Sequence, residues 1–415
     1  MIDIQEKFRC CGCNACVQRC PKHCISMHED EEGFLYPCVD TSVCIECGLC
    51  EKTCPILNQD KERKSLAVYA AKNPDDEVRV QSSSGGVFTS LAEKVIDEDG
   101  VVFGAAFDER WELVQCYAED KDELAKFRGS KYLQSKVGDT FRQAEAFLKD
   151  GRKVLYSGTP CQIAGLKRYL RKEYSNLLSV DFICHGVPSP GVFRTYMRDE
   201  IDKCAARMSG KKNTVLLPCI PLVTENDGLD LKGLQIKSIA FRDKRLGWKK
   251  FGFALKFSEA SAEGENSVLL SYGTLNENPY LRGFLKDLYL RPSCHSCTFK
   301  GLSSGSDITV ADYWNVHTLI PNLDDDKGVS AIIVSTENGL SALHETNAVL
   351  IDASWEDLLQ KNPALIRSAR CNKDRSRFFD ADNRTFDGKI EVLCRKKVSV
   401  KTLMRKLKNK MFPKK

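Results

Sequence analysis

One cysteine motif occurs twice near the N-terminus, as CCGCNACVQRCP at residues 10–21 and as CIECGLCEKTCP at residues 44–55. Both copies read Cys-x2-Cys-x2-Cys-x3-Cys-Pro, and 34 residues separate Cys10 from Cys44. An internal repeat of this kind predicts two structurally similar halves. Three cysteines at two-residue gaps, with a fourth that precedes proline, are typical of thiolate ligands to [4Fe-4S] clusters.

The motif spacing resembles that of bacterial two-cluster ferredoxins, in which the fourth cysteine of each motif binds the other cluster. We therefore predict a ferredoxin-like domain over residues 1–58. One cluster is assigned Cys10, Cys13, Cys16 and Cys54, and the other is assigned Cys44, Cys47, Cys50 and Cys20. Zinc is the alternative, although zinc sites usually use paired Cys-x2-Cys units. The remaining Cys11, Cys24 and Cys38 are interpreted as packing residues.

Composition and cysteine distribution agree with an intracellular metalloprotein. The 415 residues are 42% hydrophobic, which is enough for two or three domains with buried cores. No run of residues reaches the length of a membrane span, and MIDIQEKFRC at the N-terminus lacks the apolar centre of a signal peptide. Eleven of the 20 cysteines lie in the first 54 residues, so we expect metal ligation in the cytoplasm and not secreted disulfides.

The net charge of +5 comes from a basic tail at residues 391–415, where positions 395–415 hold ten Lys or Arg and no acid. Its apolar residues recur at helical spacing, so the tail is either a membrane-surface helix or a solvated segment. Because the rest of the chain is net acidic, nucleic-acid binding is not expected.

A second domain is predicted over residues 66–390, with an N-terminal part at 66–150 and a C-terminal part at 151–390. Apolar strand-like runs alternate there with helical patterns, as where KVLYSG (153–158) precedes PCQIAGLKRYL (160–170). This alternation favours an α/β sheet. Later runs such as IKSIAF (236–241) and VSAIIVS (329–335) have fewer helices between them, so we expect mixed strand directions. The whole chain is thus α+β: a ferredoxin-type domain followed by an α/β domain.

A further metal site is suggested by four dispersed cysteines. Cys161 and Cys184 follow strand-like runs, which places them at the carboxyl edge of a parallel sheet, where α/β proteins build sites. Cys294 and Cys297 form a single Cys-x2-Cys pair that needs two more ligands. The spacing leaves three interpretations open, namely a third [4Fe-4S] cluster, zinc, or unligated thiols.

Three polar segments could receive an anionic cofactor. Ser83, Ser84, Gly85 and Gly86 precede a predicted helix whose N-terminal amides could bind a phosphate, although, taken alone, the segment is better explained as a helix cap. Ser157, Gly158 and Thr159 precede a helix that begins at Pro160. Ser130, Lys131 and Tyr132 lie in RGSKYLQS (128–135), where a glycine stands between Arg128 and Lys131. This segment could approach an anionic ligand, or it could equally be a charged surface turn. The chain has neither GxGxxG nor a Walker A motif, so an ordinary NAD site is not expected.

Taken in order, several motifs resemble the family of coenzyme F420 hydrogenase/dehydrogenase beta subunits. They are SSSGGVFT (82–89), RGSKYLQS (128–135), LYSGTPCQIAGLK (155–167), DFICHGVPSP (181–190), FRDKRLGWK (241–249), FLKDLYLRPSCHSC (284–297) and SDITVADYW (306–314). The resemblance runs from about Leu66 to about Arg384. It implies FAD, bound by the three polar segments, and a third cluster at Cys161, Cys184, Cys294 and Cys297.

The resemblance implies an FAD- and [4Fe-4S]-dependent oxidoreductase. It would move electrons between a hydride carrier, such as reduced coenzyme F420, and ferredoxin or a redox partner subunit. Two alternatives remain: an electron-relay subunit without a small-molecule substrate, and a zinc-binding domain that contacts partners. His185 could supply a proton, but we interpret it as a structural residue.

Overall fold

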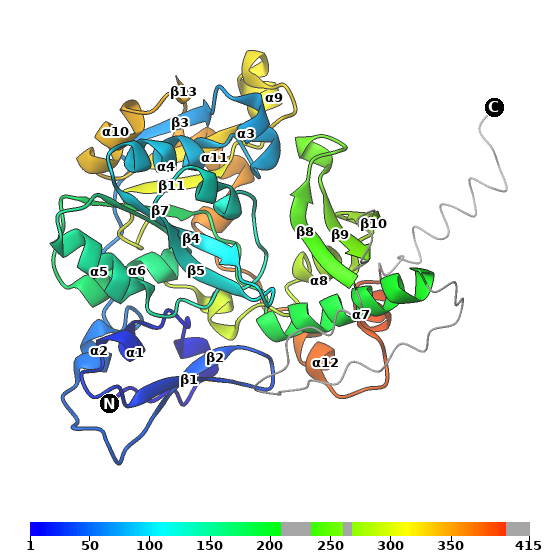
Figure 1. Cartoon of the computed structure of the whole chain (residues 1–415), viewed down its shortest axis with the longest axis horizontal. Helices are drawn as coiled ribbons and strands as arrows, with labels where there is room; N and C mark the ends of the chain where they lie inside the picture. The colour runs from blue at the N-terminus through cyan, green and yellow to red at the C-terminus, as the bar shows by residue number, and fades with distance from the viewer. Residues whose placement is uncertain (209–233, 260–267, 396–415) are drawn as a thin grey trace.

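The computed structural model describes residues 1–208, 234–259 and 268–395 (Figure 1). Residues 396–415 of the basic tail, for which the sequence leaves both a membrane-surface helix and a solvated segment open, therefore lie outside the described residues. Among the described helices, none combines the length and apolar character that crossing a membrane would require.

The N-terminal region folds as two short helices and a hairpin, shown in blue in Figure 1. Its elements are η1 (Lys7–Arg9), α1 (Ala15–Arg19), β1 (Ile25–Glu29), β2 (Leu35–Val39) and α2 (Leu49–Thr53). The repeat is visible in the backbone, because α1 follows the left-handed residue Asn14 and α2 follows the left-handed Gly48. Each helix then ends at the fourth cysteine of its motif, Cys20 or Cys54.

An eight-stranded mixed sheet forms the centre of the second region, in the order β13-β3-β12-β11-β7-β6-β4-β5. The strands are β3 (Ala67–Lys72), β4 (Val101–Phe107), β5 (Leu113–Ala118), β6 (Val154–Ser157), β7 (Leu177–Phe182), β11 (Ile308–Asp312), β12 (Ser330–Val334) and β13 (Val349–Asp352). Strands β4, β6, β7 and β11 are parallel, whereas β12 and β5 are antiparallel to their neighbours. The expectation of an α/β domain with mixed strand directions is thus confirmed.

Helices cover both faces of this sheet (Figure 1). One face is covered by α4 (Val87–Asp97) and α10 (Glu337–His344), whose apolar residues share a core with β4, β7 and β12. The opposite face is covered by α5 (Thr140–Lys149), α6 (Pro160–Leu170) and α11 (Trp355–Lys361). Shorter elements connect these layers: α3 (Asp76–Gln81), η2 (Asp122–Phe127), α9 (Val316–Leu319), η5 (Pro321–Leu323) and η6 (Pro363–Leu365).

Strands β8 (Leu234–Asp243), β9 (Gly252–Glu259) and β10 (Val268–Thr274) form a separate antiparallel sheet. The strand-like run IKSIAF (236–241) and the run FALKF (253–257) therefore do not extend the main sheet. This small sheet packs on helices through an aromatic core that includes Phe253, Tyr196 and Tyr280. The helices around it are α7 (Pro190–Met208), α8 (Pro279–Phe284), α12 (Arg375–Phe379) and α13 (Phe386–Leu393), with η3 (Trp248–Lys250) and η4 (Pro292–Ser296) nearby.

The ferredoxin-like region rests on α5 and α6 of the second region (Figure 1). The Asn14 side-chain amide donates to the Gly138 carbonyl at 2.7 Å, and the Gln18 side-chain oxygen accepts from the Phe141 amide at 3.0 Å. Gly165 in α6 allows the closest approach, because a Cβ there would lie 2.9 Å from Cys13 Cβ. The two regions thus share a tight interface beside the cysteine motifs.

Candidate functional site: a cysteine-lined cavity between two regions

The eight motif cysteines line two small cavities. The first is lined by Cys10, Cys13, Cys16 and Cys54, and the second by Cys20, Cys44, Cys47 and Cys50. These sets are the two ligand sets that the motif spacing predicts, with the fourth cysteine of each motif facing the other motif's cavity. Both cavities could hold a cubane cluster, since each brings four soft thiol ligands together.

The cysteines outside the motifs have distinct surroundings. Cys24 Sγ lies 3.4 Å from Cys20 Sγ and lines the second cavity, whereas Cys38 is exposed. Cys11 is buried in the core beneath the sheet and lines the first cavity as well as a larger one described next. The sequence pattern contains no signal for this double position of Cys11.

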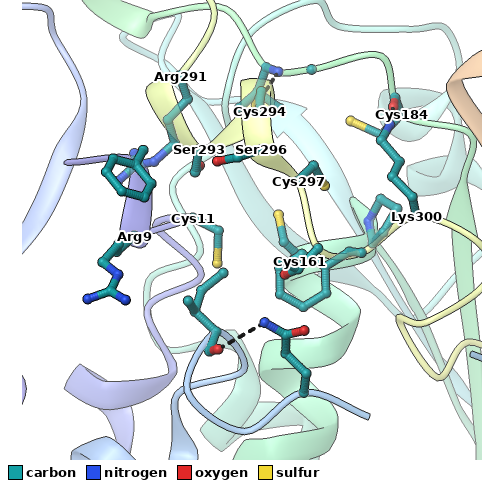
Figure 2. A pocket seen from close by; sticks show the side chains of 18 of the residues that line it. Arg9, Cys11, Cys161, Cys184, Arg291, Ser293, Cys294, Ser296, Cys297 and Lys300 are labelled. Carbon is teal, nitrogen blue, oxygen red and sulfur yellow. Dashed lines mark hydrogen bonds between the residues drawn. The ribbon is translucent and has the colours of Figure 1, made fainter. Parts of the chain in front are cut away.

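A third cavity of about 360 Å³ lies between the ferredoxin-like region and the main sheet. Figure 2 shows its four predicted ligands together with Cys11: Cys161, Cys184, Cys294 and Cys297. Cys161 lies in the first turn of α6, Cys184 follows β7, and the other two lie in and just after η4. The carboxyl edge of the parallel strands thus brings residues far apart in sequence to one place. In the described parts of the chain, no three His, Cys, Asp or Glu side chains converge closely enough to hold a single metal ion.

The cysteine thiols and the two cations that line this cavity suit an iron–sulfur cluster, which is anionic when thiolates bind it. Burial raises the pKa of the Cys184 and Cys297 thiols and raises that of Cys294 to about 12, so these thiols become thiolates only when cations stabilise them. Arg291 and Lys300 line the same cavity. Iron could supply the remaining positive charge in this cavity of about 360 Å³.

Hydrogen bonds position several of these sulfur atoms. The Val187 amide donates to Cys294 Sγ at 3.4 Å, and Thr159 Oγ1 lies 3.1 Å from Cys161 Sγ. Lys300 Nζ donates to the Cys184 carbonyl at 2.6 Å, which holds the loop after β7 against the cavity. Bonds to sulfur of this kind tune the reduction potential of iron–sulfur clusters.

Two of the predicted cofactor segments are in contact. The Ser130 amide donates to Ser83 Oγ, and the Ser84 hydroxyl donates to the Val329 carbonyl at 2.8 Å. Gly85 approaches strand β12 so closely that a Cβ would lie 2.6 Å from the Ser330 amide nitrogen, and the left-handed Gly86 precedes α4. These glycines therefore shape the turn.

Lys131 and Tyr132 follow on the same loop. Burial lowers the pKa of Lys131 to about 7, and its Nζ donates to the carbonyls of Lys126 and Arg128. The ring of Tyr132 stacks on Phe284 with centroids 4.8 Å apart. The loop thus places an aromatic ring, and a lysine amine that is bound to its own backbone, beside the Ser83 turn.

The third cofactor segment serves the fold and the cysteine cavity. The Ser157 hydroxyl donates to the Phe103 carbonyl, and the Gly158 amide donates to the Val180 carbonyl. Thr159 caps α6 in a reciprocal capping box with Gln162. Helix α6 begins at Pro160, as the sequence predicts.

Sequence reasoning missed a charged cluster next to the Ser83 turn. The Arg242 guanidinium pairs with Asp312 at 2.7 Å, and Lys244 Nζ donates to the Ser84 carbonyl at 3.1 Å. Arg242 is buried, yet its Nε and Nη2 atoms have no hydrogen-bond partner. Buried polar atoms of this kind are normally satisfied, so they fit an anionic or carbonyl group of a bound cofactor. The signal lay in FRDKRLGWK and SDITVADYW, whose charged residues fall at the ends of β8 and β11.

Aromatic contacts connect this charged cluster with the cysteine cavity. Tyr132 stacks on Phe284, and the Phe284 ring meets the His185 ring edge-on with centroids 5.6 Å apart. His185 follows Cys184 in sequence and lines the cavity. Its Nε2 lies 2.6 Å from Asp287 Oδ1, an anchoring contact. Two ring contacts therefore separate the Tyr132 loop from the cavity wall.

The two motif cavities have the four-cysteine linings expected of a ferredoxin-type iron–sulfur protein. Known family models match the ferredoxin-like region and the second region, in the order in which they occur along the chain. A 4Fe-4S dicluster domain matches residues 9–57, and the coenzyme F420 hydrogenase/dehydrogenase beta subunit matches with its N-terminal domain at 68–141 and its C-terminal domain at 151–208 and 223–353. The chain therefore belongs to the family of coenzyme F420 hydrogenase/dehydrogenase beta subunits, whose members are components of F420-linked oxidoreductases. This confirms the resemblance seen in the sequence.

Individual relatives share parts of the chain. It is 26% identical over 198 residues to one subunit of the F420H2 dehydrogenase of Methanosarcina mazei, covering 44% of this chain and 55% of the relative. It is 28% identical over 174 residues to the coenzyme F420-dependent sulfite reductase of Methanocaldococcus jannaschii, covering 40% of this chain and 26% of the reductase. A 7Fe ferredoxin of Hydrogenibacillus schlegelii is 39% identical over 64 residues, covering 15% and 76%. The matched region thus spans about half of the dehydrogenase subunit and about a quarter of the reductase.

Proposed function

We propose that the chain is an FAD-dependent oxidoreductase that transfers electrons between an organic hydride carrier and a ferredoxin-type partner through three [4Fe-4S] clusters. One observation carries this proposal: the cavity lined by Cys161, Cys184, Cys294 and Cys297 also receives Cys11 from the ferredoxin-like region. A cluster in this cavity would lie between the motif cysteines and the Tyr132 loop.

Support for FAD comes from the Arg242 cluster. Bound FAD would exchange two electrons with a hydride carrier and single electrons with a cluster. The unpartnered Nε and Nη2 of Arg242 would stabilise the negative charge that a reduced flavin carries. Tyr132 would pack against the cofactor rings, and the Ser83 turn would approach its polar parts. Lys244 holds that turn in place through the Ser84 carbonyl.

The hydride carrier that best fits the family is reduced coenzyme F420, which the names of two relatives contain. The partner would be ferredoxin or another redox protein at the exposed side of the ferredoxin-like region. Because cysteine thiols stay reduced and available to iron in the cytoplasm, we place this activity there.

A second candidate function is electron relay inside a larger complex without a substrate of its own. The observation that favours it is that one relative is named as a subunit of a dehydrogenase. Turnover of the isolated chain separates the two candidates, since a relay protein would not oxidise a free hydride carrier.

The test is anaerobic reconstitution of the full chain with iron, sulfide and FAD, followed by separate additions of reduced F420, NADH and NADPH. We expect flavin and cluster absorbance to bleach with reduced F420 and not with the nicotinamides. If dithionite bleaches both cofactors but reduced F420 does not, the deazaflavin proposal is wrong and the relay function gains support.

A further inference from the structure

Arg291 is a completely buried cation at the junction of the two regions. Its Nε donates to the Cys10 carbonyl at 2.7 Å, and its Nη2 donates to the Leu35 carbonyl at 2.9 Å and approaches Cys10 Sγ at 3.6 Å. Its Nη1 donates to the Gln134 side-chain oxygen at 2.9 Å. Arg291 therefore contacts a predicted ligand of the first cluster and also lines the third cavity, where Figure 2 shows it near Cys294.

A buried arginine normally pairs with a carboxylate, because an uncompensated charge in the interior is costly. Within the residues that the structure describes, the hydrogen bonds of Arg291 go to neutral oxygens and to a sulfur, and none goes to a carboxylate. Its neighbours are neutral oxygens, the Cys10 sulfur and the ring of Tyr36 at 4.3 Å. The missing countercharge can come from thiolates, and a cubane held by four thiolates is anionic.

The surroundings are shaped to keep this side chain in place. Gly12 has a φ of +71°, and a Cβ there would lie 2.8 Å from both Arg291 Nη1 and Gln134 Nε2. Gln134 also donates to the Cys11 carbonyl at 2.9 Å. Glycine at position 12 thus leaves room for two side chains of the second region that grip the Cys10–Cys11 backbone.

We propose that Arg291 is a positioning residue that raises the reduction potential of the cluster held by Cys10, so that this cluster accepts electrons arriving from the third cavity. This inference rests on the clusters of the proposed function. A cation that donates toward a ligand sulfur stabilises the reduced cluster, which carries one more negative charge than the oxidised cluster. The low dielectric of the interior strengthens this effect.

The contacts of Arg291 also predict which cluster changes its midpoint potential when the charge is removed. Arg291 touches Cys10 of the first ligand set and lines the third cavity, but the cavity of the second set is lined by other residues. Loss of the charge should therefore lower the midpoint potential of the first cluster most. The second cluster serves as an internal reference.

The experiment is a potentiometric titration of the reconstituted full chain, followed by electron paramagnetic resonance. Arg291→Gln removes the charge while an amide can still donate to the Cys10 carbonyl, and Arg291→Lys keeps the charge. Arg375→Met is the matched control, because Arg375 also joins the two regions, through Glu32, but its charge is already paired.

In Arg291→Gln we expect the reduced-to-oxidised ratio of one cluster to fall at least tenfold at the wild-type midpoint, a shift of about 59 mV for one electron. Arg291→Lys should retain most of the wild-type potential, and Arg375→Met should retain all of it. Loss of that cluster from the glutamine variant alone, with retention in the lysine variant, would also support the charge role.

Unchanged midpoint potentials in an Arg291→Gln variant with full iron content would overturn the inference. An equal shift of the midpoint potential in Arg375→Met would overturn it too, and so would loss of the cluster from both Arg291 variants. A wild-type chain that binds no clusters would overturn the proposed function itself. The iron assay reveals that result before any titration, so the two failures are distinguishable.

Discussion

Replacing a single cysteine of the third cavity should change the iron content of the protein. Cys294→Ser replaces a soft thiolate ligand with a hydroxyl that binds iron poorly. We expect the reconstituted variant to contain about four fewer iron atoms per chain than the wild type, measured by iron assay. Cys371→Ser is the control, because Cys371 is exposed and lies outside the three cavities. Equal iron content in Cys294→Ser and wild type would refute a third cluster at this site.

Arg242 offers a second test, which concerns the flavin. Arg242→Met removes the unpartnered Nε and Nη2 atoms, and a hydrogen bond from a charged donor contributes about 1.5–3 kcal/mol. The Kd for FAD, measured by fluorescence titration of the apoprotein, should rise roughly tenfold or more. Arg245→Met on the same segment is the control, since Arg245 also pairs with an aspartate, Asp243, but has no buried nitrogen without a partner. An unaltered Kd in Arg242→Met would remove this residue from the site.

These residues show how far sequence reasoning reaches into the candidate site. The motif cysteines could be assigned because iron–sulfur ligation imposes a fixed local spacing. Cys11 and Arg291 could not, because their importance comes from contacts between segments that are far apart in the chain. The same holds for Arg242, whose partner Asp312 lies on another strand of another sheet.

At the scale of elements, helix α6 carries Cys161 of the third cavity and also contacts the first cysteine motif. Its Gly165 faces Cys13, and a Cβ at this position would lie 3.0 Å from Cys13 Sγ. Gly165→Ala should therefore overpack the interface at a cost of about 1–3 kcal/mol, even though alanine is the better helix former. We expect a lower midpoint of thermal unfolding and loss of iron from the first cluster.

The matched control is Gly388→Ala in α13, where the nearest atom to an added Cβ is the Thr385 hydroxyl at 3.3 Å. This variant should keep its iron and unfold near the wild-type temperature. If Gly165→Ala does the same, the contact between α6 and the first motif is less tight than the structure indicates.

Strand β7 carries a buried carboxyl that makes stability depend on pH. Burial raises the pKa of Asp181 to about 6, although Ser304 and Thr309 donate hydrogen bonds to it. A raised carboxyl pKa means that the fold favours the neutral form, so this contribution to stability is full below about pH 4 and is lost as the pH rises through about 6.

Asp181→Asn should flatten this dependence. From about pH 5 to about pH 7, the unfolding free energy of the wild type should fall relative to that of the variant by on the order of 1 kcal/mol. Denaturant titrations of both proteins at several pH values measure this difference. Parallel profiles for the two proteins would show that Asp181 is not the responsible group.

The element pattern was largely predictable. Alternating apolar runs and helices indicated the α/β sheet, and Pro160 marked the start of α6. The separate β8–β10 sheet was not foreseen, because strand patterns specify alternation of side chains and not the sheet that a strand joins. Its position is set by aromatic packing against α7 and α8.

At the scale of the whole molecule, the sites follow one another in space. The Tyr132 loop leads through Phe284 and His185 to the third cavity. Cys11 lines this cavity and the first motif cavity. The second motif cavity comes next, with Cys47 exposed at its rim. If FAD binds beside the Tyr132 loop as proposed, this order would give electrons one route from the flavin to the surface, and the third cavity would be the step that joins the two regions.

The most direct test of this route is rapid mixing of the reconstituted chain with reduced F420, with flavin absorbance and freeze-quenched cluster spectra recorded in wild type and in Cys161→Ser. We expect the flavin to be reduced in both proteins, and the two ferredoxin-type clusters to be reduced rapidly only in the wild type. Reduction of those clusters at the wild-type rate in a variant shown to lack the third cluster would contradict the route.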